Sequence, residues 1–282
     1  MRKRISFISV LTMFLAIGFV IIFSRPVKAV ANGVILKSNR TYTAYDVTGD
    51  GTKDKIRIRA SNQTDDEAYS SLTVSVNGKT AYRLKNTRFY NVIANIYTLK
   101  NGQPFLYLYA PAENGDGPVC ALLKYTNGKF RKALDFTEIM AGYGNHRIGE
   151  VTNLKGNKIV ITESIVSYSL GINAINFTYK YVNGKFVPTS RYGSYKEIYS
   201  ADGSSRYFTV NSDLPTYTRP DATAVNTTLK TGSLTKIIKC ALINEKMYIQ
   251  LECDGEIYWI KALENPPISD NERQFMEVRY AG

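Results

Sequence analysis

Apolar and polar residues alternate along most of this chain, which is the pattern of strands with one buried face. Residues 72–76 (LTVSV) and 177–181 (FTYKY) are two clear examples. Successive side chains of a strand point to opposite faces, so a period of two places every apolar residue on one face. Outside the N-terminal segment no long stretch shows helical spacing, and only a short helix over residues 135–140 is expected. The sequence therefore predicts an all-β fold.

An Asn-Gly motif recurs three times between such segments. Asn77, Asn127 and Asn183 are each followed by Gly and Lys, at spacings of 50 and 56 residues. Asn-Gly between alternating apolar residues indicates a tight β-hairpin, because both central positions of the favoured turn need a positive φ. The recurrence predicts three copies of one hairpin.

A second element precedes each hairpin, namely a glycine-containing loop followed by a strand, at residues 47–58, 98–109 and 151–162. Units of about 50 residues with several strands have the size of a propeller blade. Three units are fewer than the roughly four to eight blades of a closed ring. Two arrangements stay open: a fourth blade built from residues 32–45 and 192–210, or an open stack of sheets.

The N-terminus indicates export. Three basic residues at positions 2–4 precede nineteen uncharged ones at 5–23, and Ala29-Val30-Ala31 fits a small-x-small cleavage site. This is the pattern of a secretory signal peptide, here residues 1–31. The alternative is an uncleaved anchor, because about 17–25 apolar residues span a bilayer. Either way we expect a secreted or cell-surface protein that contacts a membrane only through this segment.

The charge is basic but spread along the chain. Residues 1–31 carry five positive and no negative charges, so the net charge falls from +12 to +7 once they are removed. Such a surplus favours anionic surfaces, for example a polyanionic cell wall. No Lys/Arg run follows residue 4 and no helical basic stripe is present, so nucleic acid is not expected as a partner.

Cysteine usage argues against a disulfide framework. Only Cys120, Cys240 and Cys253 are present, and an odd number does not suit full pairing. A hairpin turn at Asn244-Glu245 would place Cys240 opposite Ile249 and Cys253 opposite Lys236. We therefore expect buried free thiols.

The loop at residues 46–54 (DVTGDGTKD) has the pattern of a calcium loop. Oxygen-bearing residues occupy positions 1, 3, 5 and 9, and Gly51 at position 6 permits a sharp turn. With the strand after it, the loop resembles the FG-GAP/VCBS-like repeats of extracellular proteins, over residues 40–195. The expected Ca²⁺ ligands are Asp46, Thr48, Asp50, Thr52 and Asp54. A polar turn that needs no ion is the alternative, and the equivalent loops at Gly102 and Gly156 lack the carboxylates.

Residues 212–263 resemble a bacterial Src-homology-3-like domain. The motifs are Leu214-Pro215-Thr216, Leu229-Lys230-Thr231-Gly232 and a closing segment that ends in Trp259. The resemblance implies a small C-terminal barrel of a kind common in wall-associated exported proteins of Gram-positive type. We expect a propeller-like domain at residues 32–204 and the barrel at 205–282. The expected ligand contacts are Tyr217, Tyr258 and Trp259.

Catalytic chemistry has little support. His146 is the only histidine, which excludes a zinc cluster or paired imidazoles, and its glycine-rich surroundings predict a surface loop. Acidic groups at residues 65–67 and at Glu113 and Asp116 could serve a glycosidase, but acidic loop residues are usually solvated. No catalytic residue is expected.

The sequence thus predicts an exported, non-enzymatic binding protein of the cell surface with one calcium-stabilised loop, whose favoured partner is a cell-wall polymer. The first alternative is a scaffold or targeting module for a partner protein or an extracellular complex. A cryptic glycan hydrolase is the third.

Overall fold

The computed structural model describes residues 34–35, 37, 39–64, 66–115, 117–200 and 203–280. Throughout this part of the chain the regular structure consists of antiparallel strands and three single 3₁₀ turns, with no α-helix. The prediction of an all-β fold is confirmed. None of the described segments forms a helix long and apolar enough to cross a membrane. The expected signal segment, residues 1–31, lies outside the described residues.

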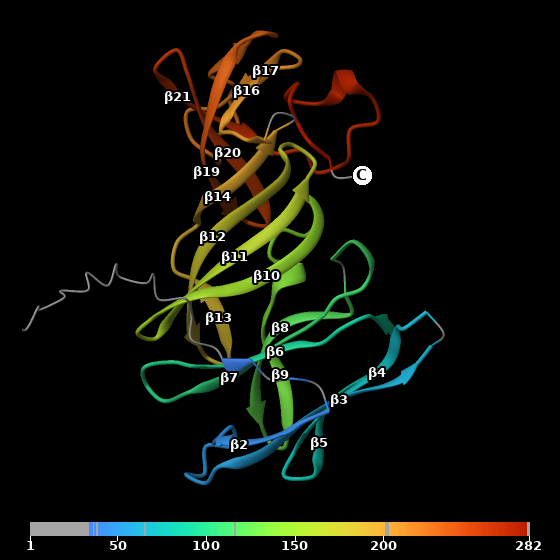
Figure 1. The fold of residues 1–282 in the computed structure, drawn as a ribbon. Coiled ribbons are helices and arrows are strands. Elements are labelled where there is room, and N and C mark those ends of the chain that lie inside the picture. Colours follow the sequence, from blue (N-terminus) through green and yellow to red (C-terminus); the bar gives the residue numbers. More distant parts are fainter. Residues whose placement is uncertain are drawn as a thin grey trace, which may run out of the picture.

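Two sheets form the N-terminal part of the molecule (Figure 1). The first sheet has the order β2-β3-β4-β5, with β2 (Thr41–Tyr45), β3 (Asp54–Gln63), β4 (Tyr69–Val76) and β5 (Lys79–Phe89). The second sheet has the order β1-β6-β7-β8-β9, with β1 (Val34–Ile35), β6 (Ile93–Thr98), β7 (Pro104–Ala110), β8 (Val119–Thr126) and β9 (Lys129–Asp135).

A long third sheet forms the rest of the molecule and has the order β10-β11-β12-β14-β19-β20-β21. Its strands are β10 (Gly144–Lys155), β11 (Lys158–Ser167), β12 (Gly171–Val182), β14 (Tyr192–Ser200), β19 (Leu234–Ile243), β20 (Lys246–Cys253) and β21 (Glu256–Lys261). Beside this path lie β13 (Lys185–Pro188), β15 (Gly203–Ser204) and β16 (Tyr207–Thr209), while β17 (Leu214–Thr216) pairs with β18 (Thr227–Leu229). The 3₁₀ turns are η1 (Glu113–Gly115), η2 (Phe136–Glu138) and η3 (Asp270–Glu272).

The three predicted hairpins are confirmed. The Asn-Gly pairs at 77–78, 127–128 and 183–184 join β4 to β5, β8 to β9 and β12 to β13, and all six residues have positive φ between 49° and 87°. Each turn connects the last two strands of a four-stranded meander, β2–β5, β6–β9 and β10–β13. The repeat seen in the sequence is therefore a repeat of structure.

A fourth blade from residues 32–45 and 192–210 does not form. β1 pairs with β6 and β2 pairs with β3, whereas β14 lies between β12 and β19. The pairing of β14 with β19 carries one sheet across the expected domain boundary at 204/205. The described strands form open sheets.

The second sheet is the middle layer between two cores. In β7, Leu106 and Leu108 face the first sheet, while Phe105 and Tyr107 face the long sheet. Because both faces are covered, β7 is a continuous apolar segment in place of an alternating one. The core on the long-sheet side contains residues from Tyr97 to Val278. The N-terminal and C-terminal parts of the chain therefore share one hydrophobic core.

Two smaller expectations have clear outcomes. The helix expected at residues 135–140 is the single turn η2, capped by Asp135. The C-terminal segment has no named strand and is joined to the rest by two isolated bridges, Val210 to Phe275 and Ser200 to Val278. All three cysteines are buried and free, as predicted.

The β19–β20 hairpin shows why a register is hard to predict over a whole strand. Cys240 lies opposite Ile249 as expected, but Cys253 does not lie opposite Lys236, whose partner is Glu252. A register shift between Ile237 and Lys239 changes the pairing by one residue in the part of the hairpin farther from the turn, which is why Lys236 pairs with Glu252.

Candidate functional site

The loop between β2 and β3 is organised by the carboxylate of Asp46. Its Oδ1 accepts the amide N–H of Gly49 (2.6 Å), and its Oδ2 accepts the amide N–H of Gly51 (2.8 Å). Burial by itself would raise the pKa of Asp46, but these amide hydrogen bonds lower the pKa below its usual value. Gly49 and Gly51 both have positive φ, which glycine adopts without strain.

Asp54 connects this loop to the first Asn-Gly hairpin. Its side chain is buried, and it accepts the amide N–H groups of Val47 (2.7 Å) and Thr48 (2.9 Å) and the side-chain N–H of Asn77 (2.6 Å). Asn77 Oδ1 in turn accepts the amide N–H of Lys55 (2.8 Å). Asp54 is thus a structural anchor with hydrogen-bond donors on several sides.

The five expected calcium ligands are only partly brought together. Thr48 Oγ1 lies 3.2 Å from Asp46 Oδ1 and 3.4 Å from Asp54 Oδ1, so these three side chains meet. Asp50 instead accepts the amide N–H of Thr52 (2.7 Å) in a turn of its own. In the described part of the chain, no three acidic, histidine or cysteine side chains are grouped closely enough to hold a metal ion. As described, the loop fits the polar-turn alternative, and calcium binding stays a prediction.

The outer face of the long sheet carries a regular array of aromatic and basic side chains. One row across β14, β19, β20 and β21 contains Tyr192, Ala241, Tyr248 and Lys261, and the next contains Ser194, Lys239, Gln250 and Trp259. We call the group on this face the aromatic–basic face: Arg191, Tyr192, Tyr217, Lys239, Tyr248, Trp259 and Lys261.

The three expected ligand contacts separate onto two sides of the sheet. Tyr217 and Trp259 exchange two backbone hydrogen bonds (2.8 and 2.9 Å) and, with Tyr248, form a small buried cluster on the outer face. Tyr258 packs against the main core on the opposite side, because side chains alternate along β21. Of the aromatic–basic face, Tyr192 presents the accessible ring, with 37% of its surface exposed.

Three cations lie over these rings. Lys239 Nζ is 4.5 Å from the ring centre of Tyr192 and 5.8 Å from that of Trp259. Lys261 Nζ lies 4.8 Å from the ring centre of Tyr217, and the Arg191 guanidinium 5.1 Å from that of Tyr192. None of the ion pairs formed within the described ranges involves these three cations. Sequence reasoning missed them, although Lys261 shares a strand face with Trp259 two residues earlier.

His146 differs from its prediction as a surface-loop residue. It lies on β10, its side chain is 13% exposed, and its Nε2 is 2.8 Å from Oε1 of Glu163, whose side chain is 2% exposed. Burial raises the pKa of Glu163 to about 7, although the contact with His146 by itself would lower this pKa. A glycine-rich sequence indicated a loop, whereas Gly144 and Gly149 are here strand residues where backbone or side chains approach closely.

The same region contains a buried thiol. Burial raises the pKa of Cys120 to about 12, and its Sγ lies 3.4 Å from the carbonyl oxygen of Gly149. A nucleophilic cysteine needs a lowered pKa, so this environment keeps Cys120 as an unreactive thiol.

Two of the acidic residues considered for a glycosidase, Asp66 and Glu113, belong to an exposed ion-pair cluster, whereas Glu67 makes none of the ion pairs in the described ranges. Asp66 and Glu113 both contact Arg88, and all three side chains are about half exposed or more. A hydrogen bond from Thr64, together with the charge of Arg88, lowers the pKa of Asp66. A general acid requires a raised pKa, so Asp66 does not have the electrostatics of a hydrolase acid. Asp65 and Asp116 lie outside the described residues.

A scan against protein-family models, a search of curated proteins and a search of solved structures give no match for this chain.

Proposed function

We propose that this chain is an exported, non-enzymatic protein of the cell surface that binds an anionic cell-wall polymer through the aromatic–basic face. The observation that carries the proposal is the position of Lys239, whose ammonium group lies over both Tyr192 and Trp259 and forms no ion pair within the described residues. A cation above an aromatic ring is attracted by the ring and keeps its outer N–H groups available.

Charge and surface chemistry on this face fit a polymer that alternates sugars or polyols with acidic groups. Arg191, Lys239 and Lys261 supply donors for phosphate or carboxylate oxygens. The exposed ring of Tyr192 offers an apolar surface for a sugar ring. The net charge of +7 that remains without residues 1–31 would assist the approach to an anionic wall.

The finer features expected from the sequence belong to the same proposal. The three four-stranded meanders support a propeller-like repeat. The strands β16 to β21, with Trp259 in a local cluster, support a Src-homology-3-like unit. Calcium in the Asp46 loop would stabilise the first meander, and we place the protein outside the cell or on its surface.

A second candidate is docking of a partner protein on the same sheet. Tyr207 (54% exposed), Leu234 (60%) and Ile257 (48%) are apolar side chains in contact with solvent at the β16–β19–β20–β21 end. Exposed apolar groups beside a basic area are typical of interaction surfaces. This observation supports the scaffold alternative.

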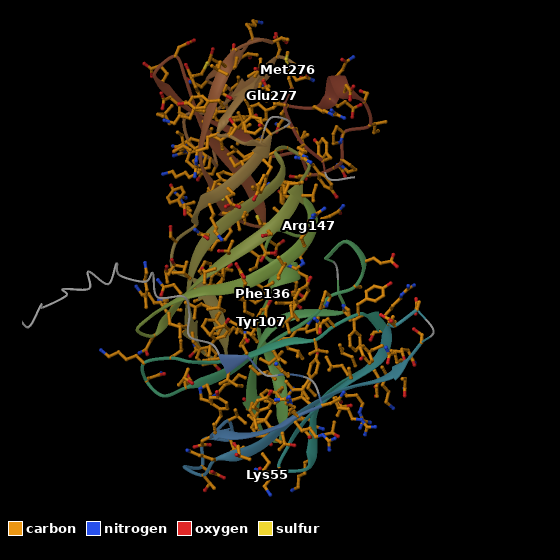
Figure 2. The ribbon with its side chains drawn as sticks, viewed as in Figure 1. Lys55, Tyr107, Phe136, Arg147, Met276 and Glu277 are labelled. Carbon is orange, nitrogen blue, oxygen red and sulfur yellow. The ribbon has the colours of Figure 1, made fainter. Side chains whose placement is uncertain are left out.

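The test uses the chain without residues 1–31 and purified bacterial walls, before and after chemical removal of their anionic polymer. Binding is measured by sedimentation at about 0.15 M salt, where exposed charges are screened beyond about 8 Å. The double variant Arg191→Gln/Lys239→Gln removes two charges from the aromatic–basic face. The matched control, Lys55→Gln/Lys79→Gln, removes two exposed charges from the N-terminal end, where Figure 2 labels Lys55.

We expect the unchanged protein and the control to bind, and the face variant to lose most of its binding. Walls without their anionic polymer should bind little. Equal binding by both double variants would contradict a role for the aromatic–basic face. Failure of all forms to bind walls would favour the partner-docking candidate. Trp259→Ala is not used, because Trp259 is buried and its loss would disturb the local cluster.

A further inference from the structure

An open cleft of about 500 Å³ lies between the two N-terminal sheets. The end of β2 contributes Tyr45, and the β2–β3 loop contributes Asp46 and Gly49. The β6–β7 hairpin contributes residues 98 and 101–104, and β8 contributes Lys124, from the second sheet. The volume lies in the range of about 300–1,000 Å³ that is usual for small-molecule sites. β2 and β7 lie in the lower half of Figure 1 and β21 at the top, so this cleft is far from the aromatic–basic face.

Lys124 is the charged residue that makes this cleft unusual. Its side chain is partly buried, its Nζ lies 5.5 Å from the ring centre of Phe105, and no ion pair within the described ranges includes it. Burial lowers the pKa of Lys124, while the charge of Asp46 raises it. An anion held at Nζ would offset the cost of removing this ammonium group from water.

Asp46 lines the same cleft but is committed to its own loop. Both of its carboxylate oxygens accept backbone N–H groups, from Gly49 and Gly51. The two groups attract each other without forming an ion pair within 4 Å. Asp46 thus shapes the wall of the cleft and leaves the N–H groups of Lys124 available.

The opposite wall carries uncharged hydrogen-bonding groups on a fixed hairpin. The side chain of Asn157 accepts the amide N–H of Asn101 (3.0 Å), and Asn101 Oδ1 accepts the amide N–H of Gln103 (3.2 Å). The hairpin itself is closed by a hydrogen bond from the amide of Gly102 to the carbonyl of Leu99. The side-chain NH₂ groups of Asn101 and Gln103 form no hydrogen bond among the described interactions. Amide groups on a rigid turn, opposite a cation and near Tyr45, suit the hydroxyl groups of a sugar.

We propose that this cleft binds a saccharide that carries one acidic group, with Lys124 contacting the acidic group and Asn101 and Gln103 contacting the hydroxyls. The acidic group is a phosphate or a carboxylate, which present the same oxygens to an ammonium group. The site is separate from the aromatic–basic face and does not depend on the proposed wall binding. A protein with both sites would hold a polymer at two points, or a polymer and a soluble fragment.

Titration calorimetry with three small probes tests the proposal: glucose 1-phosphate, glucuronate and glucose. The protein lacks residues 1–31, and each probe is titrated into the unchanged form and into Lys124→Gln, Asn101→Ala and Lys129→Gln. Lys129 is the control, because it is an exposed cation on the hairpin that follows β8. Melting curves of every variant show whether the fold is kept.

We expect an acidic probe to bind and glucose to bind more weakly. Lys124→Gln should weaken binding about tenfold or more, which is the usual contribution of a hydrogen bond to a charged group. Asn101→Ala should weaken it less, and Lys129→Gln should leave it unchanged. Binding of the phosphate alone or the carboxylate alone would support the site and identify the acidic group.

The proposal is overturned if neither acidic probe binds, if Lys124→Gln binds as well as the unchanged protein, or if Lys129→Gln loses as much affinity as Lys124→Gln. If Lys124→Gln fails to fold, Asn101→Ala decides, since it leaves the charge in place. The Arg191→Gln/Lys239→Gln form should bind the small probe normally, which separates a failure of this site from a failure of the wall-binding proposal.

Discussion

Nε2 of His146 lies 2.8 Å from Oε1 of Glu163, so the only histidine of the chain contacts a carboxyl group that is almost fully buried. The other oxygen, Oε2, has no hydrogen-bond partner among the described residues. It lies close to Gly149, where an added Cβ would be 2.5 Å from Oε2 and 2.1 Å from Phe136 Cδ1. Figure 2 shows Phe136 and Tyr107 where the second sheet meets the long sheet, with ring centres 5.8 Å apart.

Stability should fall as the pH rises from about 4.5 to about 7. The pKa of Glu163 is raised from 4.5 to about 7, chiefly by burial. The folded state therefore holds this proton more tightly than the unfolded chain, and the stabilisation is complete below the unfolded pKa and lost as the pH rises through the folded one. The expected loss is on the order of 1–3 kcal/mol, measured by urea unfolding at a series of pH values.

Glu163→Gln is the control for this titration, since it keeps the shape and removes the carboxyl proton. Its stability should match that of the unchanged protein near pH 5 and exceed it near pH 8. Parallel pH curves for the two forms would contradict the assignment. Asp135 is the further carboxylate whose charge acts on Glu163, so Asp135→Asn should shift the titration without abolishing it.

Asp54→Ala should destabilise the protein by about 3–5 kcal/mol. The substitution leaves the buried N–H group of Val47 and the partly buried ones of Thr48 and Asn77 without their shared acceptor. Asp50→Ala is the matched control in the same loop. Asp50 is exposed and contacts only its own loop, so its loss should change stability by no more than about 0.5 kcal/mol. Equal effects in chemical denaturation would show that Asp54 is not the anchor of this loop.

Calcium, if it binds the Asp46 loop, should raise the melting temperature of the unchanged protein. An ion present at 100 times its Kd adds about 2.7 kcal/mol to stability. The measurement compares thermal melting in millimolar calcium and in chelator. Asp50→Ala should remove the difference between the two conditions while keeping the melting point seen in chelator. Identical melting curves for the unchanged protein in both conditions would establish the loop as an ion-free polar turn.

Phe275→Ala should cost about 3–5 kcal/mol, because Phe275 is fully buried and its ring centre lies 5.7 Å from that of Phe208. The neighbouring Met276, labelled in Figure 2, is 46% exposed. Met276→Ala should change stability by no more than about 0.5 kcal/mol. Denaturant unfolding distinguishes the two variants. A small effect of Phe275→Ala would mean that the C-terminal segment does not close the core around Phe208.

Short-range sequence patterns specify the turns and the strand faces of this protein. Asn77-Gly78 and its two counterparts specify their turns because the two turn residues must adopt positive φ, and neighbouring residues alone decide this. The alternation at 72–76 likewise specified a strand and its buried face, since Leu72, Val74 and Val76 are all buried. The loop at Asp46 was located by the same kind of local evidence, and the structure brings Asp46, Thr48 and Asp54 together.

Which surfaces meet depends on contacts between residues that are distant in sequence. The burial of Glu163, on β11, against His146, on β10, depends on η2 packing against these strands, and no spacing in the sequence indicates that contact. The pairing of β14 with β19 and the register shift at Ile237 are also decided by neighbours distant in sequence. The residues next to Lys239 and Lys124 in the sequence form no motif that marks a binding site. What distinguishes these two lysines is their position over aromatic rings, Tyr192 and Trp259 for Lys239 and Phe105 for Lys124. Turn chemistry acts over two residues, whereas burial and electrostatics depend on every surface that the folded chain brings within contact.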